Sequence, residues 1–273
     1  MTALPAAELV DHPTPLIGPD DPPPFRLHNR QGRARALLLA DHAGVAMPAA
    51  YDHLGLGQVP LGRHIAYDIG TGWLTERLAV LLDAPALLHN YSRLMIDPNR
   101  PLDDPTSICA ISDGVVIPGN RHVDTAEAAA RAESFHRPYH RAIDAEIDRS
   151  TDRGIVPAII AMHSFTPVLR GFERPWHLGV LWADDARLPV ALMTMLGRDP
   201  ELCIGDNEPY SGRNMHGYTI ECHALPRGLP NVLIEVRQDL IDTSEAAAGW
   251  AERLAQPLLE ILADETLYRI AGG

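Results

Sequence analysis

Three features that would place the chain in whole classes of protein are missing from its sequence: paired cysteines, long apolar runs and an excess of basic residues. The only cysteines, Cys109, Cys203 and Cys222, are widely spaced and form no CxxC pair, which argues against a disulfide framework and against a cysteine zinc site. No stretch of about 18 consecutive apolar residues occurs, and the first residues carry acids and prolines where a signal peptide has a basic and then an apolar segment. We therefore expect a soluble, cytoplasmic protein with reduced cysteines.

The charge balance excludes further partners. The formal net charge is −13, whereas proteins that bind nucleic acid or anionic membranes depend on a basic surface. We expect neither nucleic acid nor membrane as a partner, and the sequence leaves open whether the chain forms a homo-oligomer. Arg93, Arg100 and Arg237 lie close to the motifs described below, where their charge could attract a small acidic substrate.

The pattern of the chain indicates one α/β domain over residues 1–273. Residues 1–33 are rich in Pro, Asp and Gly, and we expect an irregular N-terminal arm there. Apolar runs predict strands at about 35–41, 86–90, 155–162, 178–182, 218–223 and 231–237, and helical patterns fall at about 72–82, 125–149, 187–197 and 243–263. Strands that alternate with helices indicate a mainly parallel or mixed sheet covered on both faces.

Two of the predicted strands lead directly into a histidine. His42 follows the run ALLLAD, and His163 follows the run IIAM. The carboxyl ends of buried strands are where α/β sheets place ligands and catalytic groups. A hydrolytic zinc site needs three protein ligands and one open position, and imidazole is a preferred ligand. The sequence therefore predicts one Zn²⁺, or another divalent metal, bound by His42 and His163.

The third metal ligand is less directly indicated. Asp68 in the segment HIAYDIG is the nearest suitable carboxylate, and it stands just before the helix expected to begin near Thr71. The same position would suit a residue that caps that helix. His64, at the start of the segment, is a weaker alternative ligand.

Glu235 lies inside the apolar run NVLIEV, where an unpaired carboxylate is costly to bury. It has the chemistry of a general base that takes a proton from the attacking water and passes it to the leaving nitrogen. Arg237, two residues further along the strand, faces the same side and could pair with it. A structural Glu235–Arg237 pair without a catalytic role is the alternative.

A second charged segment suits the recognition of a substrate. The sequence SRLMIDPNR at 92–100 contains Arg93, Asn99 and Arg100. A guanidinium grips a carboxylate by two parallel hydrogen bonds, and an asparagine amide can add another donor. A solvated charged turn would explain the same residues, although the apolar residues between them argue against it.

Seven short motifs, taken together and in this order, resemble the N-formylglutamate amidohydrolase family. They are DHAG at 41–44, YDIG at 67–70, SR at 92–93 with DPNR at 97–100, RPYH at 137–140, MHSF at 162–165, DNEPYS at 206–211 and IEVRQDL at 234–240. The resemblance runs from about residue 34 to 262. That family is similar to the zinc carboxypeptidases, alongside aspartoacylase and succinylglutamate desuccinylase.

The resemblance implies a phosphorylase/hydrolase-like three-layer fold with a central mixed sheet, and zinc on His42 and His163. It also implies Glu235 as the general base, Asn99 and Arg100 as the grip on the substrate's carboxylate, and Arg93 as a helper at the oxyanion or carboxylate. The zinc peptidases have a glutamate three residues after the first histidine, whereas this chain has Val45.

The leading hypothesis is a metal-dependent amidohydrolase that cleaves a short N-acyl group, such as formyl, from an acidic amino acid. A carboxypeptidase-like enzyme or another N-acyl-amino-acid deacylase is one alternative. A relative without activity that binds a small acidic ligand is the other.

Overall fold

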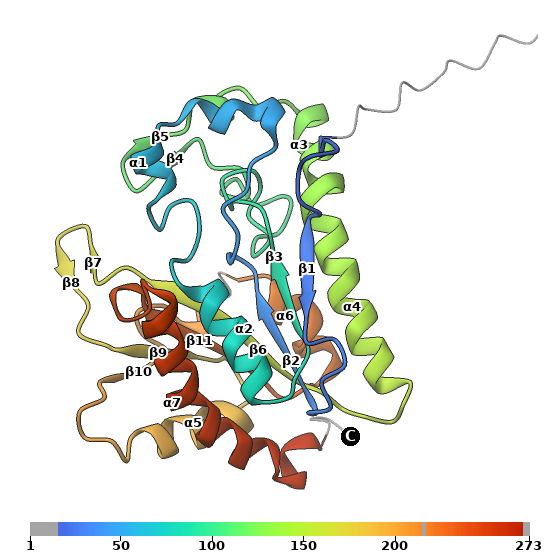
Figure 1. Cartoon of the computed structure of the whole chain (residues 1–273), viewed down its shortest axis with the longest axis vertical. Helices are drawn as coiled ribbons and strands as arrows, with labels where there is room; N and C mark the ends of the chain where they lie inside the picture. The colour runs from blue at the N-terminus through green and yellow to red at the C-terminus, as the bar shows by residue number, and fades with distance from the viewer. Residues whose placement is uncertain (1–15, 215–216, 270–273) are drawn as a thin grey trace, which may run out of the picture.

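A seven-stranded mixed sheet forms the centre of the molecule (Figure 1). A computed structural model describes residues 16–214 and 217–269 of the chain. The strands follow the order β1-β3-β2-β6-β11-β9-β10. Their bounds are Phe25–His28 for β1, Ala36–Ala40 for β2, Ala86–His89 for β3, Ala158–Phe165 for β6, Leu178–Leu181 for β9, Ile204–Asp206 for β10 and Asn231–Arg237 for β11.

The four inner strands β3, β2, β6 and β11 run parallel, so their carboxyl ends meet at one edge of the sheet. Strand β1 is antiparallel to β3, and β9 is antiparallel to β11. In β2 and β6 every residue is buried, as expected for strands covered on both faces. The register places Glu235 beside His163, at the edge where the parallel strands end.

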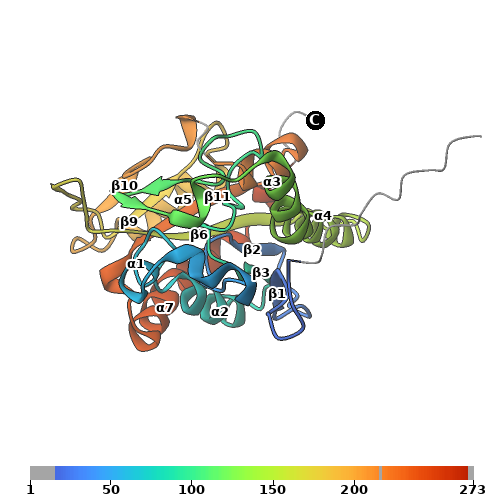
Figure 2. The same cartoon turned by 90° about the horizontal axis from the view of Figure 1, so that it is seen from above.

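Helices cover both faces of the sheet, as the view from above shows (Figure 2). One face packs against α2 (Thr71–Leu81), α5 (Arg187–Leu196) and α7 (Ser244–Leu262). The other packs against α4 (Arg137–Thr151) and the five-residue α6 (Thr219–His223). This arrangement confirms the predicted α/β class with a central mixed sheet between helices.

A smaller apolar cluster lies in the part of the chain beyond the carboxyl ends of β2 and β3. The backbone of this part is drawn at the top of Figure 1. The cluster includes Tyr91, Leu94 and Phe135. The surrounding elements are α1 (Gln58–Leu61), α3 (Thr125–Arg131) and the hairpin of β4 (Ile111–Ser112) and β5 (Val115–Val116). A second hairpin, of β7 (Val168–Leu169) and β8 (Phe172–Glu173), follows β6. The upper cluster supports the segment that contains Arg93 and Arg100.

The predicted helix over 125–149 is interrupted near its middle. A π-helical turn, Ala132–His136, joins α3 to α4, and Pro138 stands in the first turn of α4. Proline provides no N–H for the preceding turn, so a wider turn at this point costs little hydrogen bonding. The extra residue in the turn brings Arg131, His136 and His140 to positions where each donates to the segment 95–100.

Two predictions of secondary structure were wrong. The strand predicted at 218–223 is absent, and residues 219–223 form α6, because the side-chain oxygen of Asn99 accepts hydrogen bonds from the backbone N–H groups of Tyr218 and Thr219 and caps a helical turn. The arm at 1–33 is not irregular throughout, since β1 pairs with β3 at the edge of the sheet. Residues 1–15 of the arm lie outside the described residues.

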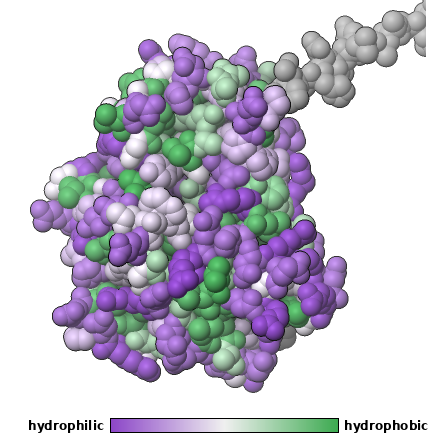
Figure 3. Space-filling model, viewed as in Figure 1, coloured by the Kyte–Doolittle hydropathy of each residue, from purple (hydrophilic) through white to green (hydrophobic). Residues whose placement is uncertain are grey.

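The surface is largely polar on the face drawn in Figure 3, where hydrophobic residues form scattered patches. Among the helices of the described residues, none has the length and apolar character needed to cross a membrane.

Candidate active site

The structure brings His42, Asp68 and His163 together in a buried cluster at the carboxyl edge of the sheet. Their candidate ligand atoms all lie within 4.8 Å of one another. Oδ2 of Asp68 is 2.8 Å from Nδ1 of His163 and 3.3 Å from Nδ1 of His42. These two nitrogens and the carboxylate therefore converge on one point.

Asp68 does not cap the following helix. Helix α2 begins after Gly70 and has no side-chain cap, whereas Asp68 lies in the histidine cluster. Gly70 has a φ of 80°, and a Cβ there would lie 2.0 Å from the carbonyl oxygen of Ile241. Only glycine fits this turn, which carries the chain from Asp68 into α2. His64 lines the cavity but lies 3.6 Å from Asp113, apart from the cluster.

Two further carboxylates hold the outer nitrogens of the histidines. Nε2 of His42 is 2.7 Å from Asp97 Oδ1, and Nε2 of His163 is 3.2 Å from Asp41 Oδ2. The Tyr139 hydroxyl donates to the other oxygen of Asp41 at 2.9 Å. Carboxylates in this position fix the ring orientation of metal-binding histidines and raise their basicity.

Arg93 completes this charged cluster. Its guanidinium donates twice to Asp97 Oδ2, at 2.6 and 3.1 Å, and one of its nitrogens lies 3.6 Å from Asp68 Oδ1. In this structure Arg93 is held by two carboxylates beside the metal-binding cluster, while it still lines the cavity.

The cluster has the electrostatics of a site that exchanges protons for a cation. Burial alone would lower the pKa of His163, but hydrogen bonds with Asp41 and Asp68 raise it well above its usual value. The carboxylates Asp68 and Asp97 likewise raise the pKa of His42 against the effects of burial and Arg93. For Asp41, burial acts to raise the pKa, but the hydrogen bond with His163 and its charge outweigh burial. The pKa of Asp41 is lowered to about 2. A metal ion would take the place of the protons on the two Nδ1 atoms.

The donor set fits a divalent metal of the zinc type. Two imidazoles and one carboxylate are a common set for catalytic zinc, and three protein ligands leave a position open. The ligand nitrogens face inward and the outer nitrogens already have carboxylate partners. His42, Asp68 and His163 could therefore hold the ion without rearrangement of their supports.

Glu235 lies beside this cluster, next to His163 in the register of β11 and β6. Its side chain is buried, and no described residue hydrogen bonds to its Oε2. Burial raises the pKa of Glu235 to about 7, although His163 acts in the opposite direction. A carboxyl group with this pKa accepts and releases protons near neutral pH, which is what a general base needs.

Arg237 does not pair with Glu235. Its guanidinium donates to both oxygens of Asp239, at 2.8 and 3.2 Å, and to the carbonyls of Arg174 and Trp176. The two residues share a strand face, but the chain turns away after Arg237 into a 3₁₀ turn that holds Asp239 beside it. The proposed pair was therefore wrong, and Arg237 is absent from the cavity lining.

Asn99 and Arg100 do line the cavity. Asn99 uses its oxygen to cap α6, so its amide nitrogen is the group that can donate to a ligand. Arg100 donates from one nitrogen to the backbone oxygen of Asn99 at 2.8 Å, which orients its planar fork. Arg100 and Arg93 bring positive charge to the cavity, and the neutral Asn99 adds a hydrogen-bond donor.

A second group of buried histidines holds the segment that carries Asn99 and Arg100. His140 lies 2.8 Å from the carbonyl oxygen of Pro98 and 2.7 Å from His223, which in turn lies 2.8 Å from Asp144. His136 lies 3.0 Å from the carbonyl oxygen of Arg100. Since a carbonyl only accepts, both histidines donate to the backbone of the segment.

The site occupies a cavity of about 390 Å³, whose lining includes the metal-binding cluster, Glu235, Asn99 and Arg100. Sequence analysis missed the roles of Asp41, Asp97, His136 and His140. Asp41 directly precedes His42 at the end of a buried strand, and that position is the one signal that could have identified it. The others depend on contacts between residues that are far apart in the chain.

Fold and site together define a class: an α/β protein whose buried His–Asp–His group could bind a metal ion beside an unpartnered carboxylate. A family model for N-formylglutamate amidohydrolase matches residues 34–242, and the chain belongs to this family. The predicted family is thereby confirmed.

Solved structures share the fold of this chain. The structure of gene product Atu2144 from Agrobacterium tumefaciens is 31% identical in sequence with a TM-score of 0.87, and the match covers 91% of this chain and 98% of that one. The N-formylglutamate amidohydrolase from Ralstonia eutropha JMP134 is 21% identical with a TM-score of 0.65, over 88% of this chain and 97% of that one, and shares the fold. No curated protein matches the chain.

Proposed function

We propose that the chain is a zinc-dependent amidohydrolase that removes a short acyl group, such as formyl, from an acidic amino acid such as glutamate. The observation that carries the proposal is the convergence of His42, Asp68 and His163 beside the buried, unpartnered Glu235. Membership of the N-formylglutamate amidohydrolase family supports the same reaction class. With N-formylglutamate as substrate, the products are formate and glutamate.

His42, Asp68 and His163 would hold a divalent metal, which would supply a Lewis acid to activate water and polarise the acyl carbonyl. Glu235 takes one proton from the attacking water as the oxygen bonds to the acyl carbon. It then delivers this proton to the nitrogen as the carbon–nitrogen bond breaks, and the amine leaves neutral. Its pKa near 7 suits both steps.

The substrate binds beside the arginine residues that line the cavity. Arg100 and Asn99 line the cavity, and in this proposal they bind a carboxylate of the amino acid, the guanidinium through two hydrogen bonds. Arg93 lies between the cluster and the cavity, where its charge stabilises negative charge that develops on the acyl oxygen.

Metal analysis and a substrate panel test the proposal. We expect about one zinc per chain, and hydrolysis of N-formylglutamate in preference to the same compound with its carboxylates as amides. A charge-assisted hydrogen bond is worth roughly 1.5–3 kcal/mol, so Arg100→Ala should lower kcat/KM for the acid by about 10- to 150-fold and reduce that preference. Arg100→Lys should recover little, because an ammonium lacks the planar fork. A metal-loaded protein that hydrolyses no N-acyl amino acid would show that the proposal is wrong.

A further inference from the structure

The cavity continues past Glu235 along the floor of the sheet. Leu233 and Asn231 alternate with buried residues on β11, point to the same side as Glu235 and line the cavity with it. With a rise of about 3.3 Å per residue, Leu233 lies about 7 Å and Asn231 about 13 Å along the strand from Glu235. The cavity is therefore longer than the space around the metal-binding cluster.

The walls of this extension are apolar. Leu181 on β9 is the register neighbour of Leu233, and Ile220 and Leu225 approach from α6 and the turn that follows it. We call the space bounded by Leu181, Ile220, Leu225 and Leu233 the β11 groove. Leu233 is only partly buried although β11 lies between β6 and β9 inside the sheet.

The groove exists because helix packing on this face is incomplete. Helix α4 packs on the apolar side chains of β2, β3 and β6, whereas β11, within the described residues, is covered on this face by the five-residue α6 and the short turn that follows it. Residues 209–211, which also line the cavity, are not helical. Water against four aliphatic side chains is unfavourable, and an apolar ligand in the groove would remove that cost.

We propose that the β11 groove binds the acyl chain of the substrate, so that the enzyme accepts straight aliphatic acyl groups of roughly four to six carbons, a length set by the roughly 7 Å between Glu235 and Leu233 along β11. This inference rests on the proposed amidohydrolase function. In the proposed function Asn99 and Arg100 hold the carboxylate-bearing half of the amide, so the other half, the acyl group, extends over Glu235 into the groove. Asn231 marks its polar far end.

A series of N-acylglutamates tests the inference. Acetyl, butanoyl and hexanoyl substrates have similar intrinsic reactivity, so their comparison reports binding of the chain. Each buried methylene is worth about fourfold, and we expect kcat/KM to rise about 15-fold from acetyl to butanoyl. A flat or falling series would overturn the proposal. The proposal would also be overturned if kcat/KM rose when the amino-acid side chain was lengthened and the acyl group was kept as acetyl.

Two variants that fill the β11 groove test whether the dependence of kcat/KM on acyl chain length arises there. Leu233→Phe and Leu225→Phe each place a ring in the groove, and each should lower the hexanoyl-to-acetyl ratio of kcat/KM by about 10-fold or more. Leu27→Phe, on the edge strand β1 outside the cavity, is the matched control and should leave that ratio as in the wild type. If the hexanoyl-to-acetyl ratio is the same in the wild type and in all three variants, the preference for chain length comes from another surface.

A binding experiment separates failure of this inference from failure of the proposed function. Acetate, butanoate and hexanoate are titrated into the wild-type protein by calorimetry, which needs no turnover. A Kd that tightens with chain length in the wild type, and less so in Leu233→Phe, supports the groove even if no amide is hydrolysed. Equal Kd values for the three acids overturn the groove, whatever the enzyme hydrolyses.

Discussion

The molecule contains two groups of buried histidines that differ in what surrounds them. His42 and His163 face carboxylates from both ring nitrogens, and the pKa of each is raised. His136 and His140 face backbone carbonyls of the segment 98–100, and burial lowers the pKa of both, that of His140 to about 3. The first group attracts a cation, while the second consists of neutral donors that fix a loop.

This difference shows that burial of a histidine does not by itself indicate its role. A carboxylate partner makes the ring a strong base toward a proton or a metal ion, whereas a carbonyl partner makes it a fixed hydrogen-bond donor. The two groups lie on either side of the segment 97–100: Asp97 contacts His42, and Pro98 and Arg100 contact His140 and His136. Mutations should therefore separate metal binding from substrate binding.

The largest expected effect is on metal content. His42→Ala and His163→Ala each remove one of three ligands, and we expect loss of the bound metal and of measurable hydrolysis. His140→Ala is the matched control, since it removes a buried histidine that faces no carboxylate in the cluster. Elemental analysis of purified proteins measures the metal. Full occupancy in either of the first two variants would remove that histidine from the ligand set.

Glu235→Gln should have the next largest effect. It preserves shape but removes the base, and general bases contribute about 10²–10⁴-fold to the chemical step. We expect kcat to fall in this range with metal content unchanged, as measured by steady-state kinetics on metal-loaded protein. Near-normal turnover would rule out Glu235 as the base.

How far the site could be predicted from the sequence depends on the kind of contact. His42, His163 and Glu235 end or lie in buried apolar strands, and parallel strands bring such residues to one edge, so local pattern was sufficient to bring them together. Arg237 was assigned from the same alternation, but the turn after β11 gives it Asp239 as a partner. Asp97 supports His42 from 55 positions away in the chain, and His140 supports Pro98 from 42 positions away. No local sequence pattern encodes such pairs.

The fold shows the same limit. Long apolar runs identified β2, β6 and β11, because burial on both faces leaves a strong signal. Residues 218–223 have strand-forming composition, but the start of this segment is held in a helical turn by the hydrogen bond from the Tyr218 N–H to Asn99, which lies 119 residues earlier in the chain. Tertiary contacts override local preference for such short segments.

Glu235 also predicts a pH dependence of stability in the metal-free protein. Its pKa is about 7 when folded and 4.5 ordinarily, so the folded state binds the proton more tightly. The stabilisation by this proton is complete below pH 4.5 and is lost as the pH rises to 7, and it amounts to about 3 kcal/mol. Urea unfolding in the presence of a chelator measures it. Between pH 4.5 and 7 the free energy of unfolding of the wild type should fall relative to that of Glu235→Gln, and above pH 7 the difference should stay constant. If the two proteins show the same dependence on pH, burial does not raise the pKa of Glu235.

Smaller effects should follow from the supporting carboxylates. Asp41→Asn and Asp97→Asn keep the shape of the side chain but weaken the orientation of His163 and His42. Loss of such a partner typically costs 10- to 100-fold in metal affinity. Competition with a chelator of known affinity measures this, with Asp144→Asn, beside His223, as the control. An unchanged affinity in Asp41→Asn would mean that the 3.2 Å contact does not orient the ring.

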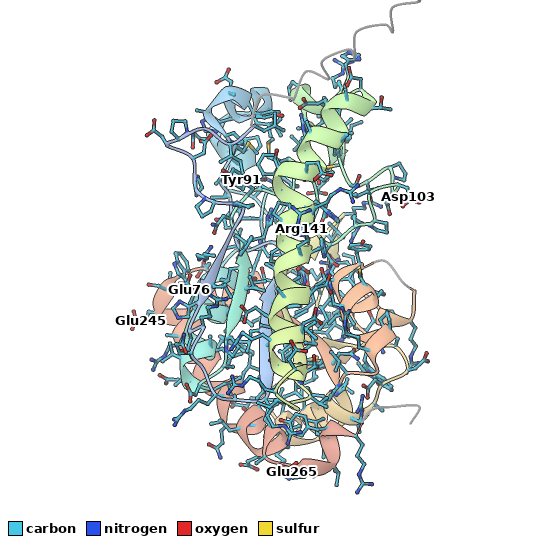
Figure 4. The ribbon with its side chains drawn as sticks, turned by 90° about the vertical axis from the view of Figure 1, so that its right-hand side faces the viewer. Glu76, Tyr91, Asp103, Arg141, Glu245 and Glu265 are labelled. Carbon is cyan, nitrogen blue, oxygen red and sulfur yellow. The ribbon has the colours of Figure 1, made fainter. Side chains whose placement is uncertain are left out.

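The smallest effect should come from the carbonyl-bound histidines, and it should fall on substrate binding. His140→Phe keeps the ring volume but leaves the carbonyl of Pro98 without its donor, and one hydrogen bond is worth about 0.5–1.5 kcal/mol. Because Asn99 and Arg100 follow directly, we expect KM to rise about 2- to 13-fold, while kcat and metal content change little. Arg141, the next residue on α4, faces solvent (Figure 4), and Arg141→Ala is the control for the helix itself. A fall in metal content in His140→Phe, with KM unchanged, would show that the two groups of histidines are not separate in function.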